Sequence, residues 1–131
     1  MSPLANKLYT QLRKRIVAGQ QSITYAALAR AAGKVHPRSP ALHAALGELT
    51  NACRHAGLPV LPAIVWKAGA NRPSTGYYKV AHPRAHTDEA RLSAWQKEHA
   101  KVVEDPARFP ASLGAGWEHR GSAPRGAGSR R

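Results

Sequence analysis

The chain has 131 residues, 43% of them hydrophobic, and it carries 20 Lys and Arg against seven Asp and Glu, a formal net charge of +13. This length allows one domain with a modest core and a tail, and the absence of any run of about 18 apolar residues predicts no membrane-spanning helix. The single Cys excludes an internal disulfide, and an N-terminus without an apolar stretch predicts an intracellular, cytoplasmic protein.

The charges are distributed unevenly along the sequence. Residues 1–87 contain twelve Lys and Arg but only one carboxylate, that of Glu48, and so carry +11. Residues 88–105 carry −2, with three basic and five acidic residues, and residues 106–131 carry +4, with five Arg and one Glu. Like charges on one compact body repel each other, so a chain that omits its acids is expected to meet a polyanion. Nucleic acid is the leading candidate, because neutralised phosphates release counterions.

Two helices are predicted in the first third of the chain. Leu4, Leu8, Leu12 and Ile16 recur at four-residue spacing, which predicts an amphipathic helix over residues 3–17. A shorter helix is predicted within residues 22–30, with the Thr24 hydroxyl capping its first turn and Gly33 as its end.

Ser39-Pro40 is the clearest helix start in the chain, a capping hydroxyl followed by proline at the first helical position. The predicted helix, residues 40–56, has an apolar stripe that ends at Cys53. Two helices joined by a short basic turn, the second with a polar face, are typical of a helix-turn-helix.

A β-hairpin is predicted after these helices. Residues 58–66 are apolar and β-branched, and residues 77–80 form a second strand candidate. The loop between them is rich in Gly, Asn and Pro. A basic hairpin after a helix-turn-helix is a wing, here residues 67–75.

Thr87 is predicted to cap a fourth helix whose packing face includes Leu92, Trp95 and His99. Beyond Pro106 the apolar pattern weakens, and from Gly114 onward it is lost. The predicted fold is therefore mainly α with a small β-hairpin. It comprises a winged helix-turn-helix domain with a C-terminal packing helix (1–105) and a flexible, disordered Arg, Gly and Ser-rich basic tail (106–131).

The segment Ile23-Thr24-Tyr25-Ala26-Ala27-Leu28-Ala29 resembles the DNA-binding domain of the O6-alkylguanine alkyltransferases and of their non-catalytic relatives, the alkyltransferase-like proteins. In this resemblance, residues 40–46 match the recognition helix, Pro62-Ala63 the active-site position and Gly76-Tyr77 a later element. It implies a winged-helix DNA-binding fold in which Tyr25 contacts the target phosphate. The family's Cys-His-Arg run is replaced here by Ala63-Ile64-Val65, so alkyl transfer does not follow.

The candidate DNA-binding residues fall into three groups around this scaffold. The turn between the helices supplies phosphate contacts, the polar face of helix 40–56, which also includes Gly47 and Arg54, can read base edges, and the wing can contact the backbone. The full set is Tyr25, Arg30, Lys34, His36, Arg38, Ser39, His43, Asn51, Lys67, Asn71 and Arg72.

No catalytic group, metal or cofactor is predicted. Cys53 completes an apolar stripe, as an inert buried cysteine does. His82 and His86 lie four residues apart, but in a loop-like stretch that contains Pro83 and has no cysteine nearby to complete a zinc site. A metal-dependent nuclease would need clustered carboxylates, and the pair Asp88-Glu89 is explained by a helix start.

The sequence therefore predicts a protein that binds double-stranded DNA and is not an enzyme, in a regulatory, architectural or lesion-sensing role, and nucleoid-associated if so. Three alternatives stay open. The chain can be a small basic protein-interaction module that acts as an inhibitor or adaptor of another protein. It can also bind RNA or the ribosome, or be a merely soluble basic protein.

Overall fold

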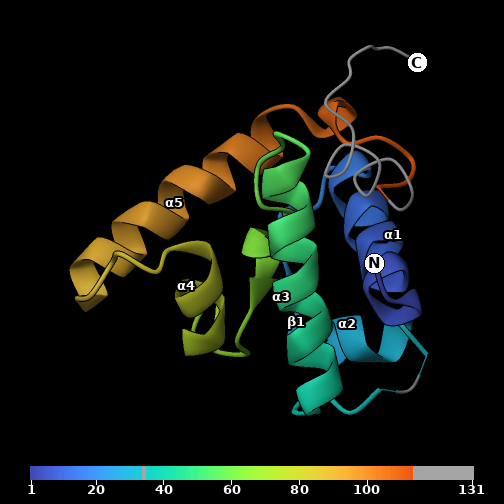
Figure 1. Cartoon of the computed structure of the whole chain (residues 1–131), viewed down its shortest axis with the longest axis horizontal. Coiled ribbons are helices and arrows are strands. Elements are labelled where there is room, and N and C mark those ends of the chain that lie inside the picture. The colour runs from blue at the N-terminus through green and yellow to red at the C-terminus, as the bar shows by residue number, and fades with distance from the viewer. Residues whose placement is uncertain (34, 114–131) are drawn as a thin grey trace.

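A computed structural model describes residues 1–33 and 35–113 of the chain (Figure 1). This part is mainly helical, with one small parallel sheet. In chain order its elements are α1 (Pro3–Val17), β1 (Ile23–Thr24), α2 (Tyr25–Ala31), α3 (Pro40–His55), η1 (Leu61–Ile64, a 3-10 helix), β2 (Val65–Trp66), α4 (Thr75–Ala81), α5 (Asp88–Glu104) and η2 (Pro106–Arg108, a 3-10 helix).

The long helix α3 lies at the centre of the arrangement. Figure 1 shows α1 along one side of it, α4 on the other, α2 below, and α5 running diagonally above α4. The buried stripes of α1, α3 and η1 pack against one another and form one continuous hydrophobic core. No helix in residues 1–33 or 35–113 is long and apolar enough to cross a membrane.

The structure confirms the four helices expected from stripes and caps. Thr24, Ser39 and Thr87 each accept a backbone N–H in the first turn of the helix that follows, at 3.2, 3.1 and 3.1 Å. In α1, Leu8 and Leu12 of the expected stripe are fully buried. Capping hydroxyls and apolar spacing act locally, which is why the sequence alone locates these helices well.

The predicted β-hairpin is wrong. Residues 77–80 lie within α4 and not in a strand, and Tyr77 and Tyr78 bury their rings against the core. The residues between β2 and α4 form a closed turn with no antiparallel strands beside it. Lys67 N–H donates to the carbonyl of Arg72 at 2.8 Å, and Asn71 has a φ of +56°. The predicted 67–75 wing is therefore a turn followed by a helix start.

The actual sheet joins segments far apart in the sequence. β1 and β2 run parallel, with Ile23 opposite Val65 and Thr24 opposite Trp66. Ile23 and Val65 are both buried, so the pair contributes to the core as well as to backbone hydrogen bonding. A parallel pair needs a long crossover, and here the crossover consists of α2, the turn after it, α3 and η1.

Residues 106–113, which the sequence assigned to the tail, pack against α1. Phe109 is 1% exposed and Leu113 is 4% exposed. Arg13 Nε donates to the carbonyl of Phe109 at 2.9 Å, and the hydroxyl of Tyr9 donates to the carbonyl of Pro110. The folded part thus extends beyond the expected boundary at residue 105. The remaining predicted tail, residues 114–131, lies outside the described residues.

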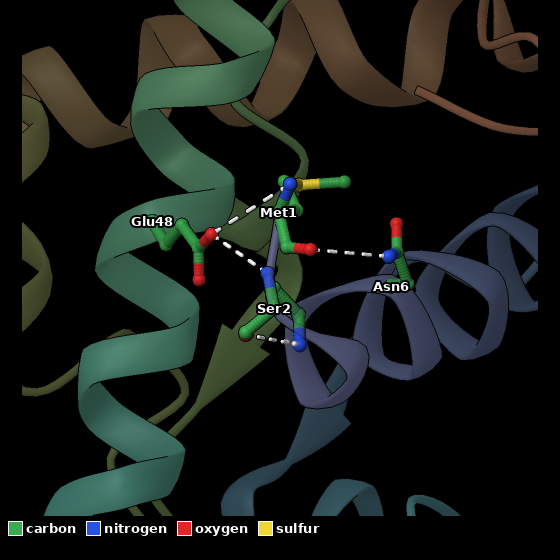
Figure 2. Close-up of polar contacts among 5 residues, drawn as sticks. Met1, Ser2, Asn6 and Glu48 are labelled. Atoms are coloured by element: carbon green, nitrogen blue, oxygen red, sulfur yellow. Dashed lines mark hydrogen bonds and ion pairs between the residues drawn. The ribbon is translucent and has the colours of Figure 1, made fainter. Parts of the chain in front are cut away.

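The lone carboxylate of the first 87 residues ties α1 to α3. Figure 2 shows Glu48 of α3 facing the start of α1. Its Oε2 accepts the backbone N–H of Ser2 at 2.8 Å and lies 3.9 Å from the Met1 amino group. Ser2 is also the N-cap of α1, since its hydroxyl accepts the N–H of Ala5 at 3.1 Å. One acid therefore holds the cap of one helix onto the flank of another.

Replacing Glu48 with alanine should lower the free energy of unfolding by about 1 kcal/mol, because a charge-assisted hydrogen bond to Ser2 is lost at a half-exposed site. Glu48→Gln, which keeps an acceptor without the charge, should lose less. Urea unfolding measures both. Glu104→Ala, at an exposed position of α5, is the matched control. An equal effect of Glu48→Ala and Glu104→Ala would contradict the role of Glu48.

Candidate nucleic-acid interface

One face of α3 is open to solvent along most of its length. His43, Ala44, Asn51 and Arg54 are exposed on this face, whereas Leu42 and the other apolar residues on the opposite side are buried. The exposed residues recur at helical spacing and so form a single stripe. Its first turns carry mainly small side chains, which let the backbone of α3 approach another surface closely.

Tyr25 holds three elements together beside this stripe. Its ring lies 5.5 Å from that of His43, measured between centroids. Its hydroxyl lies 3.0 Å from Ser74 Oγ and accepts the Ser74 N–H at 3.1 Å. The start of α2, the first turns of α3 and the N-cap of α4 therefore meet at one side chain. The first role of Tyr25 in the structure is to position these elements, since its hydroxyl already has partners.

The last turn of α2 and the turn that follows it present the guanidinium groups of Arg30 and Arg38 to solvent. Arg30, His36 and Arg38 are exposed, and His36 Nδ1 accepts the Arg38 N–H at 3.0 Å, which fixes the path of the turn. Ser39, also predicted to contact DNA, uses its hydroxyl to cap α3. Lys34 lies outside the described residues.

The turn between β2 and α4 presents a second group of predicted residues. Lys67, Asn71 and Arg72 are all exposed. This turn leads directly into Ser74, which is bound to Tyr25. The structure thus connects the α2–α3 side of the predicted site with the 67–72 turn through Tyr25, although no hairpin is present.

A narrow groove separates α3 from α4. Its volume is about 50 Å³, and Tyr25, His43, Gly47, Pro62 and Gly76 are among the residues that line it. This volume is about a third of that of an engineered cavity, about 150 Å³, that holds benzene. Ala63, the active-site position of the resemblance, is fully buried, and its carbonyl accepts the Trp95 indole N–H at 2.8 Å.

The described carboxylates lie away from the exposed stripe of α3, and only Asp88 among them, at the start of α5, lines a hollow together with Lys67 and Arg72. Among residues 1–33 and 35–113, the exposed acids are Asp88, Glu89, Glu104 and Asp105, all in α5 or directly after it. Glu48 and Glu98 are only partly exposed, and each accepts a backbone N–H, those of Ser2 and Val60, at 2.8 Å. Consequently α2, the exposed stripe of α3 and both turns present cations with no exposed carboxylate of their own.

Cys53, Tyr77 and His82 are titratable residues that pack wholly or partly inside the protein. Desolvation by burial raises the pKa of the Cys53 thiol to about 12, so the reactive thiolate is scarce at neutral pH. Burial also raises the pKa of Tyr77 and lowers that of His82, and the Tyr77 hydroxyl lies 2.9 Å from His82 Nε2. In the described part of the chain, no three His, Cys, Asp or Glu side chains gather in a way that could hold a metal ion.

The DNA-binding residues predicted from the sequence do not include Arg91, Ser74 or Tyr78. Arg91 and Tyr78 line a second, more polar hollow together with Lys67 and Arg72. These residues come from separate elements, and they meet only because α4 and the start of α5 fold back onto the 67–72 turn. No pattern in the sequence signals that contact.

Replacing Tyr25 with phenylalanine should leave the ring in place but remove both contacts to Ser74. We expect a loss of about 1 kcal/mol in unfolding free energy and faster hydrogen exchange at the Ser74 amide. The amide of Ala27, which the Thr24 hydroxyl holds, is the internal control. Unchanged exchange at Ser74 would show that Tyr25 does not position the start of α4.

A comparison of the chain with models of protein families, with curated proteins and with solved structures finds no match.

Proposed function

We propose that the protein binds double-stranded DNA without catalysing a reaction. In this proposal α2 and α3 act as a helix-turn-helix, α3 approaches a groove with its exposed stripe, and the segments 34–38 and 67–75 contact the flanking phosphates. The second segment takes the place that a wing has in a winged helix, although it is a turn and not a hairpin.

The observation that carries this proposal is the distribution of charge over the described residues. Arg30, Arg38, Lys67 and Arg72 are exposed, and none of them takes part in the ion pairs found in the described residues, Met1–Glu48 and Arg108–Asp105. Holding several unneutralised cations on one body costs free energy, which a polyanion would offset on binding. Most of the affinity is then electrostatic and falls steeply with added salt.

The shape of α3 supports a helix-in-groove contact. Pro40, Ala41 and Ala44 are exposed and short, so they leave the first turns of the helix uncrowded. Asn51 and Arg54 follow on the same exposed stripe, and their side chains have the geometry to bond adenine and guanine edges. The contact of Tyr25 with His43 and Ser74 would keep the two flanking turns in register with this helix.

Replacing Arg38 and Arg72 together with alanine should weaken duplex binding and flatten its salt dependence. Each phosphate contact contributes about 0.9 to the slope of log K against log salt, so the double variant should lose about 2 from that slope. Fluorescence anisotropy with a labelled duplex at several salt concentrations measures the slope for both proteins.

The matched control is Lys97→Ala with Lys101→Ala, which removes the same charge from exposed positions of α5. An equal loss of slope in both double variants would contradict a localised interface. The same titration with structured RNA tests the closest alternative, and tighter binding to RNA than to duplex at each salt concentration would overturn the assignment to DNA. An absence of saturable binding to either nucleic acid would favour a protein partner.

Introducing a carboxylate on the stripe of α3 provides a second test. Ala44→Glu should reduce duplex affinity at least about tenfold, because the new charge faces the phosphates at close range. Ala100→Glu makes the same substitution at an exposed position of α5 and should change affinity little. Equal affinities of the two variants would place the contact away from α3.

A further inference from the structure

A polar hollow lies between the 67–72 turn and the starts of α4 and α5. Its volume is about 150 Å³. The lining residues are Lys67, Ala70, Arg72, Pro73, Ser74, Thr75, Tyr78, Asp88 and Arg91. Because a water molecule takes about 30 Å³, this space fits a tetrahedral oxyanion with part of its hydration shell.

The turn itself brings two cations together. Lys67 N–H donates to the carbonyl of Arg72 at 2.8 Å, and Ala70 N–H donates to the carbonyl of Lys67 at 3.1 Å. Gly69 and Asn71 make this closure possible with positive φ values of +80° and +56°. The two basic residues therefore lie at adjacent ends of a closed turn, where their charges repel each other.

Arg91, in the first turn of α5, adds a third cation to the lining of the hollow. Its Nε donates to the carbonyl of Ala85 at 3.2 Å, and its guanidinium carbon lies 5.8 Å from the centroid of the Tyr78 ring. Both contacts hold the side chain in one orientation and limit the entropy that a ligand contact would cost.

The charge of the hollow is only partly balanced. Asp88 is its one carboxylate, and no ion pair within 4 Å in the described residues joins it to Lys67, Arg72 or Arg91. Three cations and one anion leave an excess of +2. Burial raises the pKa of Tyr78, whereas Arg72 and Arg91 oppose that shift, so both guanidinium groups act on the same wall of the hollow.

We propose that this hollow binds a dianionic phosphate group, either as inorganic phosphate or as a phosphate monoester. A dianion matches the excess charge of the three cations and Asp88, and the Thr75 hydroxyl adds a donor at the rim. The bidentate fork of a guanidinium suits phosphate oxygens. This site lies outside the stripe of α3 but shares Lys67 and Arg72 with the segment proposed to contact DNA phosphates. Its occupation by a free phosphate does not require that the protein bind DNA.

The test is a titration of the isotope-labelled full chain, followed by the amide resonances of residues 67–75 and 88–91. Inorganic phosphate and a nucleoside 5′-monophosphate are added at constant ionic strength, with dimethyl phosphate as the monoanionic diester. Saturable shifts are expected with the first two, and binding several-fold weaker is expected with the diester. An absence of saturable shifts at constant ionic strength, or equal affinity for the diester, would overturn the proposal.

Variants separate the site from general surface charge. Lys67→Gln and Arg72→Gln, at exposed positions, should each weaken phosphate binding about three- to fivefold. Asp88→Asn should strengthen it by a similar factor, because it removes the one repulsive charge. Lys97→Gln on α5 should leave it unchanged. Equal affinities across all four variants would refute the site. DNA is absent from this experiment, so the salt titrations of duplex binding stand or fall separately.

Discussion

The parallel pairing of β1 with β2 is the constraint on which the rest of the arrangement depends. It fixes Thr24 beside Trp66, so the chain that forms α2 and α3 must leave this point and return to it. Thr24 is also the N-cap of α2, and the next residue, Tyr25, reaches Ser74 at the start of α4. The pairing of β1 with β2 therefore helps to set the relative positions of the starts of α2 and α4. No local feature of the sequence predicts this pairing, because β1 precedes α3 in the chain and β2 follows it.

The scarce acids are used where they hold the backbone or favour a helix start. Glu48 and Glu98 each accept a main-chain N–H from another element, and Asp88 and Glu89 lie in the first turn of α5, where the helix dipole favours negative charge. The remaining carboxylates of the described residues lie at the end of α5. This distribution leaves the α2–α3 side of the molecule basic, with Asp88 as the one exposed acid of the described residues beside Lys67 and Arg72. It links the stability of the fold to the electrostatics of the proposed interface.

Much of the helical framework could be predicted from the sequence, because stripes and capping hydroxyls are local signals. The exposed face of α3, with His43 and Asn51, followed from the same periodicity. α4 could not be predicted, since Tyr77 and Tyr78 favour strands in isolation and only their burial against the core stabilises a seven-residue helix there. The parallel sheet and the packing of Phe109 on α1 are long-range contacts. For the same reason the sequence found Lys67 and Arg72 but not their neighbour Arg91.

The burial of Cys53 has a practical consequence. It is the only cysteine in the chain, and its side chain, on the buried side of α3, has no exposed surface. Its raised pKa keeps it in the unreactive thiol form. A thiol reagent can modify it only when the packing between α3 and η1 opens transiently. The labelling rate of this thiol therefore reports how often the core opens transiently. Mass spectrometry can measure that rate with no probe engineered into the chain.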